Sequence, residues 1–175
     1  MSFFSSDIIL VTGANGHVAQ HVISQLLSLS PSPQVRATIR STSSKAEVIQ
    51  TFKKSVEEGQ LDLHIVEDIT VEDVFEDALR DVTYIAHIAS PLTLNPRSVE
   101  DDLLIPAMKD TTSVLHSAMN SPMLKSVVIT SSFAAAFDRK EGYRPGYVYS
   151  SIDWNPITYL EAANPSLDQG QYPAQ

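Results

Sequence analysis

A glycine-rich turn carries the clearest chemical signal in this sequence. The segment Val11-Thr-Gly-Ala-Asn-Gly-His-Val-Ala19 follows a short apolar run and opens an amphipathic stretch. Gly13 and Gly16 would permit a tight bend and close approach of a ligand to the backbone, while the N-terminus of the following helix would receive a pyrophosphate. Ala19 would let that helix pack closely on the strand. We therefore predict a dinucleotide-binding turn, and a plain structural turn is the alternative, because Asn-Gly also occurs in ordinary turns.

The end of the second predicted strand indicates which dinucleotide would fit. A site that prefers NAD usually places Asp or Glu there to bind the ribose hydroxyls, whereas Arg suits the 2′-phosphate of NADP. This chain has Arg40 at that position, followed by Ser41 and, a little further on, Lys45. A planar guanidinium and a mobile ammonium group could hold a phosphate together, which favours NADP(H). The alternative is that both are ordinary solvated cations.

Histidines and serines supply weaker candidates. His17 and His21 lie four residues apart on a predicted helix, but no Glu follows His17 as in a His-Glu-x-x-His site, so we expect no metal. Ser131 and Ser132 follow the fifth predicted strand, at the sheet edge where open α/β folds bind ligands. They could equally form a polar strand end that the backbone satisfies. We interpret His87 as a buried or pocket-shaping imidazole rather than a general base.

These residues lie on an alternating pattern of strands and helices. Short apolar runs predict strands over residues 7–12, 34–40, 61–66, 82–89 and 126–130. Helical periodicity covers about residues 16–29, 44–58, 71–80 and 100–120. The alternation predicts an α/β fold, a Rossmann-like doubly wound parallel sheet of about five strands with helices on both faces. The pattern stops after Phe137, so we predict a nucleotide-binding portion over 1–137 and an irregular tail over 138–175.

Composition excludes several classes of protein. The chain has 175 residues, a formal net charge of −9 and no cysteine. This charge opposes general binding to nucleic acid or anionic lipid, and the lack of cysteine excludes disulfides and thiolate chemistry. No apolar run approaches the roughly 18 residues needed to cross a bilayer. The N-terminal segment lacks the basic region of a signal peptide, so we expect a cytoplasmic protein without nucleic-acid or membrane partners.

Five segments together resemble the extended short-chain dehydrogenase/reductase superfamily. They are the Thr-Gly-x-x-Gly-x-x-Ala spacing of the turn, His87-Ile-Ala-Ser-Pro91, Asp102-Leu-Leu-Ile-Pro-Ala107, Thr130-Ser-Ser-Phe-Ala-Ala135 and Asp153-Trp-Asn-Pro156. In combination they are similar to the branch of the NAD-dependent epimerase/dehydratase group that contains dihydroflavonol reductases, cinnamoyl-CoA reductases and fungal ketone or methylglyoxal reductases. The resemblance implies a Rossmann fold, NADP(H) as cofactor, and reversible reduction of a small ketone or aldehyde to an alcohol.

The resemblance also assigns roles to residues. The positions that match cofactor contacts are Gly13, Asn15, Gly16, His17, Val18, Arg40, Lys45, Asp68, Ile69, Ala89 and Ser90. Asp68 and Ile69 match positions that touch the adenine, although Asp68 could instead be the N-cap of the third predicted helix. Ser132, rather than its neighbour Ser131, matches the serine that hydrogen-bonds the substrate carbonyl. Asp110 departs from the family, which commonly has Gly at that point of the fourth helix.

The family's proton donor has no counterpart among these residues. In the family a Tyr transfers the proton, and a Lys four residues later lowers its pKa. None of the six tyrosines here is followed by lysine at that spacing. The family's pair lies just beyond a segment like 153–156, so we expect this sequence to stop short of the catalytic pair and the substrate-binding part. The alternative is a non-catalytic dinucleotide-binding or interaction module, and the oligomeric state is left open.

Overall fold

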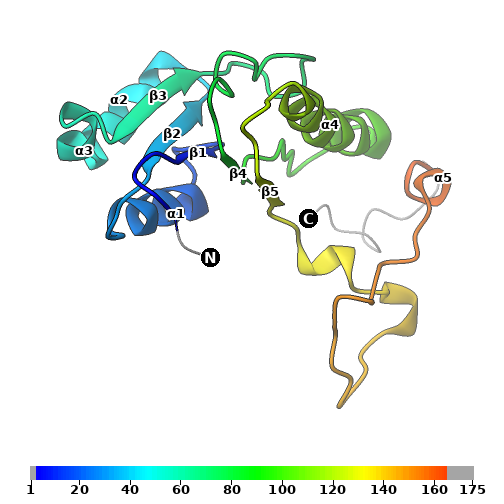
Figure 1. The fold of residues 1–175 in the computed structure, drawn as a ribbon. Coiled ribbons are helices and arrows are strands. Elements are labelled where there is room, and N and C mark those ends of the chain that lie inside the picture. Colours follow the sequence, from blue (N-terminus) through cyan, green and yellow to red (C-terminus); the bar gives the residue numbers. More distant parts are fainter. Residues whose placement is uncertain (1–2, 165–175) are drawn as a thin grey trace. The chain divides into compact units, whose positions relative to one another are not determined.

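The computed structural model of this chain describes residues 3–164 (Figure 1). The chain forms two units. The first unit comprises Met1–Ser90 and Ala107–Thr130, and the second comprises Pro91–Pro106 and Ser131–Gln175. The predicted boundary at residue 137 stays a prediction. Residues 165–175 of the predicted tail lie outside the described residues. No helix in residues 3–164 is long and apolar enough to cross a membrane.

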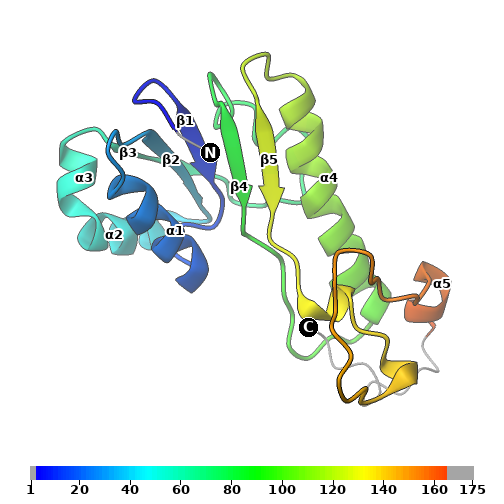
Figure 2. The ribbon, with the colours of Figure 1, turned by 60° about the horizontal axis from the view of Figure 1, so that its bottom comes forward.

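A five-stranded parallel sheet forms the centre of the first unit (Figure 2). Its strands are β1 (Ile8–Val11), β2 (Gln34–Ile39), β3 (Leu61–Ile65), β4 (Tyr84–His87) and β5 (Ser126–Ile129). Their order is β3-β2-β1-β4-β5, so the chain builds outward from β1 in one direction and then returns to add β4 and β5 on its other side. In register, Leu10 of β1 lies between Arg36 of β2 and Ile85 of β4. The predicted Rossmann-like sheet is confirmed.

The helices match the prediction less closely than the strands do. They are α1 (His17–Leu27), α2 (Thr42–Thr51), α3 (Lys53–Glu57) and α4 (Ile105–Met119), with a π-helical turn, η1 (Glu100–Leu104), just before α4. The single helix predicted over 44–58 is divided at Phe52, whose φ of −116° and ψ of 33° interrupt the helical path.

The helix predicted over 71–80 was wrong. This segment is a series of turns, and Asp73 and Asp81 have positive φ values of 59° and 62°. Aspartate tolerates the left-handed region better than most residues, but that conformation cannot continue a right-handed helix. The apolar side chains that suggested the helix are nevertheless buried, Phe75 at 0% and Leu79 at 3% exposure. The periodicity therefore reported burial and not backbone geometry.

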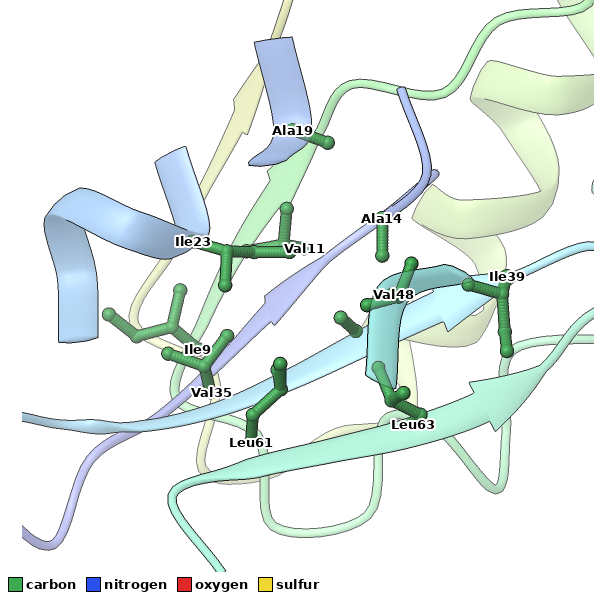
Figure 3. Close-up of a cluster of buried hydrophobic side chains, with 11 residues drawn as sticks. Ile9, Val11, Ala14, Ala19, Ile23, Val35, Ile39, Val48, Leu61 and Leu63 are labelled. Carbon is green, nitrogen blue, oxygen red and sulfur yellow. The ribbon is translucent and has the colours of Figure 1, made fainter. Parts of the chain in front are cut away.

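Alternate residues of β1 face opposite sides of the sheet, as a strand requires. Ile9 and Val11 join a cluster beneath α1 and α2 (Figure 3), whose buried members are Ile9, Val11, Ala14, Ala19, Ile23, Val35, Ala37, Ile39, Val48, Leu61 and Leu63. Leu10 points the other way, toward the 71–82 segment and α4, in a second cluster of Leu10, Val66, Phe75, Ala78, Leu79, Val82, Ile85, Val114 and Ala118. Both faces of the sheet are thus covered.

The second unit is built from short elements. These are η1, the 3-10 turns η2 (Phe133–Ala135) and η3 (Arg139–Glu141), and the helix α5 (Tyr159–Ala162). The described part of the irregular tail, residues 138–164, therefore contains a short α-helix that the periodicity did not indicate. A capping box starts this helix: Glu161 Oε2 accepts from the Thr158 amide at 2.9 Å, and the Glu161 amide donates to Thr158 Oγ1 at 3.3 Å.

Candidate nucleotide-binding site

The turn between β1 and α1 has a geometry that requires glycine at Gly13. Its φ is +71°, and a Cβ added there would lie 3.1 Å from the Cβ of Ala89, which follows β4. The Gly16 amide donates to the Gly13 carbonyl at 2.8 Å, and a Cβ on Gly16 would lie 3.1 Å from the same oxygen. Ala19 is fully buried in the first core cluster. The tight bend and the close helix–strand packing expected from the sequence are both present.

The N-terminus of α1 is open to an anion. Its N-cap is Gly16, which offers no side-chain cap, and no acidic residue lies in the first turn. Because the first amide groups of a helix have no intrahelical acceptor and lie at the positive end of its dipole, this terminus suits a phosphate group. Asn15, His17 and Val18 are exposed around it.

The two histidines of α1 lie close together. The rings of His17 and His21 meet edge to face with centroids 4.7 Å apart. Within residues 3–164, no group of three or more His, Cys, Asp or Glu side chains could hold a metal ion. His17 therefore enters the site only as an exposed side chain beside the turn.

Two threonines anchor the turn to the neighbouring strands. Thr38, near the end of β2, accepts from the Gly13 amide at its Oγ1 (3.3 Å) and from the Ala14 amide at its carbonyl (2.8 Å). Thr12 Oγ1 accepts from the amides of Ile88 and Ala89, at 2.9 and 3.0 Å. Thr38 was not predicted as a site residue from the sequence. Its signal was present, since Thr38 is a polar residue between apolar ones at the carboxyl end of a buried strand.

Arg40 and Lys45 have different environments. Arg40 is exposed directly after β2, and no described residue forms a hydrogen bond or ion pair with its side chain. Ser41 next to it caps α2 by accepting from the Ser44 amide at 3.3 Å. The half-buried Lys45 donates from Nζ to the carbonyl of Leu63 on β3 at 3.2 Å. Arg40 is thus available to an incoming anion, whereas the amine of Lys45 already has a backbone acceptor.

Asp68 and Ile69 follow β3 in a turn. Asp68 Oδ1 accepts from the amide of Thr70 at 2.9 Å and from its hydroxyl at 2.7 Å, and these bonds lower the pKa of Asp68. No helix begins here, so the N-cap alternative for Asp68 is wrong. Ile69 packs against the second core cluster. Beyond β4, Ala89 is half-buried against the glycine turn and Ser90 is exposed.

Ser131 and Ser132 belong to the second unit, whereas the glycine turn belongs to the first. Both are exposed. Ser132 is the N-cap of η2, and its Oγ accepts from the amide of Ala134 at 3.2 Å. This bond leaves the hydroxyl proton of Ser132 free to be donated to another acceptor.

The fold and the turn together define the class of this protein. A parallel sheet in the order β3-β2-β1-β4-β5, with a glycine turn opening the first helix, is a Rossmann-type fold. The model of the 3-beta hydroxysteroid dehydrogenase/isomerase family matches residues 10–146, and the chain belongs to this family. The predicted resemblance to dehydrogenases and reductases is confirmed.

Fungal reductases are among its relatives. An uncharacterized oxidoreductase of Schizosaccharomyces pombe is 38% identical over 159 residues, which are 90% of this chain and 46% of that protein. The NADPH-dependent methylglyoxal reductase of Saccharomyces cerevisiae is 30% identical over 157 residues, 86% of this chain and 44% of its own length. The crystal structure of Gre2 from Candida albicans in complex with NADPH is similar with a TM-score of 0.82 and 32% identity, covering 94% of this chain and 48% of that one. The chain spans about half the length of the relatives it matches.

Proposed function

We propose that this chain is the NADP(H)-binding portion of a cytoplasmic carbonyl reductase of the extended short-chain type, which reduces a small ketone or aldehyde to an alcohol. The observation that carries the proposal is the N-terminus of α1, which has no side-chain cap. It follows the tight turn in which Gly13 lies against Ala89. Relatives support the choice of cofactor, since one is named as NADPH-dependent and another was solved with NADPH.

Different residues around the turn would bind different groups of the cofactor. The pyrophosphate would lie on the amide groups of the turn, among Gly13, Asn15, Gly16, His17 and Val18. Arg40 would bind the 2′-phosphate with its planar fork, which agrees with its exposure and with its lack of a partner among residues 3–164. Lys45 would contribute less, because its amine must first leave the Leu63 carbonyl.

The remaining contacts lie at the ends of β3 and β4. Asp68 and Ile69 would contact the adenine, and Ala89 and Ser90 would line the cofactor beyond β4. NADPH, when bound, supplies a hydride to the carbonyl carbon. Ser132 would donate its free proton in a hydrogen bond to the carbonyl oxygen, on which negative charge develops.

Nucleotide binding is the first test. Isothermal titration calorimetry of residues 1–175 should detect NADPH binding, with NADH weaker, and NADPH should raise the melting temperature. Arg40→Glu should weaken NADPH binding by about tenfold or more and reverse the preference between NADPH and NADH. The substitution replaces a hydrogen-bond donor to the 2′-phosphate with an acid that suits ribose hydroxyls. Lys54→Glu is the matched control, since it makes the same change in net charge on an exposed residue of α3. No binding of either nucleotide at millimolar concentration would overturn the proposal.

The lack of a Tyr-x-x-x-Lys pair favours a second candidate, a dinucleotide-binding module without catalysis. Both candidates predict that residues 1–175 alone oxidise no NADPH in the presence of ketones or aldehydes. A chimera in which residues 1–160 precede the C-terminal half of the methylglyoxal reductase from S. cerevisiae separates them. The reductase proposal expects turnover that Ser132→Ala reduces about a hundredfold. A chimera that folds and binds NADPH but turns over nothing would favour the module.

A further inference from the structure

A buried acid–histidine pair lies behind the glycine turn, within the first unit. His87, the last residue of β4, and Asp110, on α4, are each only 2% exposed. Nε2 of His87 lies 3.1 Å from Oδ1 of Asp110. On the other side of the ring, Nδ1 lies 3.0 Å from Oγ1 of Thr12, the residue that precedes Gly13. A continuous line of polar contacts therefore runs from the middle of α4 to the start of the turn.

The hydrogen bonds of Thr12 determine which nitrogen of His87 carries the proton. Thr12 Oγ1 already accepts from two backbone amides, those of Ile88 and Ala89. A hydroxyl group has two acceptor sites and one proton, so the proton of Thr12 must be donated to Nδ1 of His87. Nδ1 is then an acceptor, and the ring proton is on Nε2, which faces Asp110. A doubly protonated ring would require a third donor at Thr12 Oγ1.

Stability alone does not explain an acid at position 110. The other buried residues of α4 are Ser113, Val114, Ser117 and Ala118, all uncharged. Burial of a carboxylate costs free energy, and an apolar residue of similar size is often no worse for stability than a buried ion pair. The pair is also imperfectly aligned, because neither Nε2 of His87 nor Oδ1 of Asp110 completes a hydrogen bond of normal geometry in the described chain.

We propose that Asp110 and His87 are positioning residues for the nucleotide-binding turn. Asp110 holds the Nε2–H tautomer of His87, and the opposite nitrogen of that ring orients the hydroxyl of Thr12. The Thr12 hydroxyl fixes the amide of Ala89, and the Ala89 side chain lies against Gly13. A change at position 110 thus reaches the turn without any contact between Asp110 and the cofactor. The expected effect on binding rests on the proposed function, whereas the line of contacts does not.

Two variants at position 110 and one control test the binding effect. Asp110→Leu keeps the branching of the side chain at Cγ but has no acceptor, so we expect the Kd for NADPH to rise about tenfold. Asp110→Asn keeps an oxygen that can accept from Nε2, and it should stay within about threefold of the wild type. Ser113→Ala removes a buried hydrogen bond of the same helix, to the Val71 carbonyl, and should lower the melting temperature without changing the Kd. An unchanged Kd in Asp110→Leu would overturn the proposal.

A measurement without nucleotide separates this proposal from the proposed function. Nitrogen-15 NMR of the His87 ring in the chain 1–175 should show the Nε2–H tautomer. The amide signals of Gly13 and Ala89 should shift in Asp110→Leu and stay in place in Ser113→Ala. The Nδ1–H tautomer, or unshifted Gly13 and Ala89 signals in Asp110→Leu, would contradict the positioning role. Should the wild type bind no NADPH, the proposed function fails and these spectra still decide the role of Asp110.

Discussion

Each of the two units of this chain is stabilised by a different kind of interaction. Every buried hydrophobic residue in the described part of the chain lies in the first unit, packed on one face or the other of the sheet. The second unit exposes large apolar side chains, with Tyr143 at 91%, Ile152 at 85% and Leu160 at 83%. Since burial of apolar surface is the main source of folding free energy, cooperative stability resides in the first unit.

Local polar contacts take the place of a core in the second unit. Asp153 accepts from the Tyr147 hydroxyl and from the amide of Ser150, and these bonds lower the pKa of Asp153. The same contact with the Asp153 carboxylate raises the pKa of Tyr147. Exposed hydrogen bonds of this kind contribute little to global stability, so each should be lost locally and without cooperativity. We therefore expect substitutions in the two units to have effects on stability that differ in kind as well as in size.

The largest effect is expected at the glycine turn. Gly13→Ala would place a Cβ at a φ of +71° and 3.1 Å from the Cβ of Ala89. We expect loss of NADPH binding by about a hundredfold or more, since both the backbone strain and the collision distort the turn. Titration of the variant with NADPH measures this loss.

Gly59→Ala is the matched control for this substitution. Gly59 has the same φ of +71°, but a Cβ there would meet nothing within 4 Å. The control should cost about 1 kcal/mol of stability and leave binding unchanged. Equal losses of NADPH binding in the two variants would show that the effect is general destabilisation of the first unit.

A medium effect is expected at the other end of the sheet. Asp7 is buried, accepts from Lys125 Nζ at 2.7 Å and from the Phe4 amide at 2.8 Å, and these bonds lower its pKa. Asp7→Asn should lower the melting temperature by about 5 °C. Because folding lowers the pKa of Asp7, its stabilisation is complete above pH 3.8. It is lost as the pH falls through the lower pKa of the folded state.

Thermal unfolding at several pH values checks this sign. The difference in melting temperature between the wild type and Asp7→Asn should be constant near neutral pH and shrink below pH 3.8. The hydrogen bond to Asp7 raises the pKa of Lys125. The contribution of Lys125 to stability is therefore complete below pH 10.5 and is lost as the pH rises through the higher pKa of the folded state. A difference that grows on acidification would contradict the assignment.

The smallest effect is expected at the capping box of α5. Hydrogen bonds from Thr158, together with Lys140, lower the pKa of Glu161 to about 2. Glu161→Ala should speed hydrogen exchange of the α5 amides by about threefold and leave the melting temperature unchanged. The wild-type contribution is complete above pH 4.5 and is lost as the pH falls toward 2.

Glu141→Ala is the control for α5, because Glu141 pairs with Arg144 in the same unit. It should not alter exchange in α5. A fall in melting temperature in Glu161→Ala as large as that in Asp7→Asn would show that the second unit unfolds together with the first, which would remove the distinction drawn between them.

The strands could be predicted from the sequence because a strand that is covered on both faces consists of a short run of apolar residues. The helix boundaries could not. Val74, Phe75, Ala78 and Leu79 have helical spacing, but only the backbone angle at Asp73 shows that the segment is turned. The helix α5 was missed although its Thr-x-x-Glu signature, Thr158 to Glu161, is present in the sequence.

The candidate site divides in the same way. Gly13 and Gly16 could be located because a turn of this kind demands their residue type, and Arg40 because it ends a recognisable strand. The contact between Lys45 and the carbonyl of Leu63 could not be foreseen. Nor could the pairing of His87 with Asp110, because it depends on how closely a distant helix approaches the sheet.

The close contact between Gly13 and Ala89 also limits how this sequence can vary over evolution. A Cβ at position 13 would lie 3.1 Å from the methyl group of Ala89, which is closer than ordinary van der Waals contact. A larger residue at position 89 would push toward the turn just as surely as a side chain at position 13. We therefore expect Gly13 and Ala89 to be retained together in related sequences. Even Ala89→Val should be disfavoured, although most exposed alanines would tolerate the same replacement.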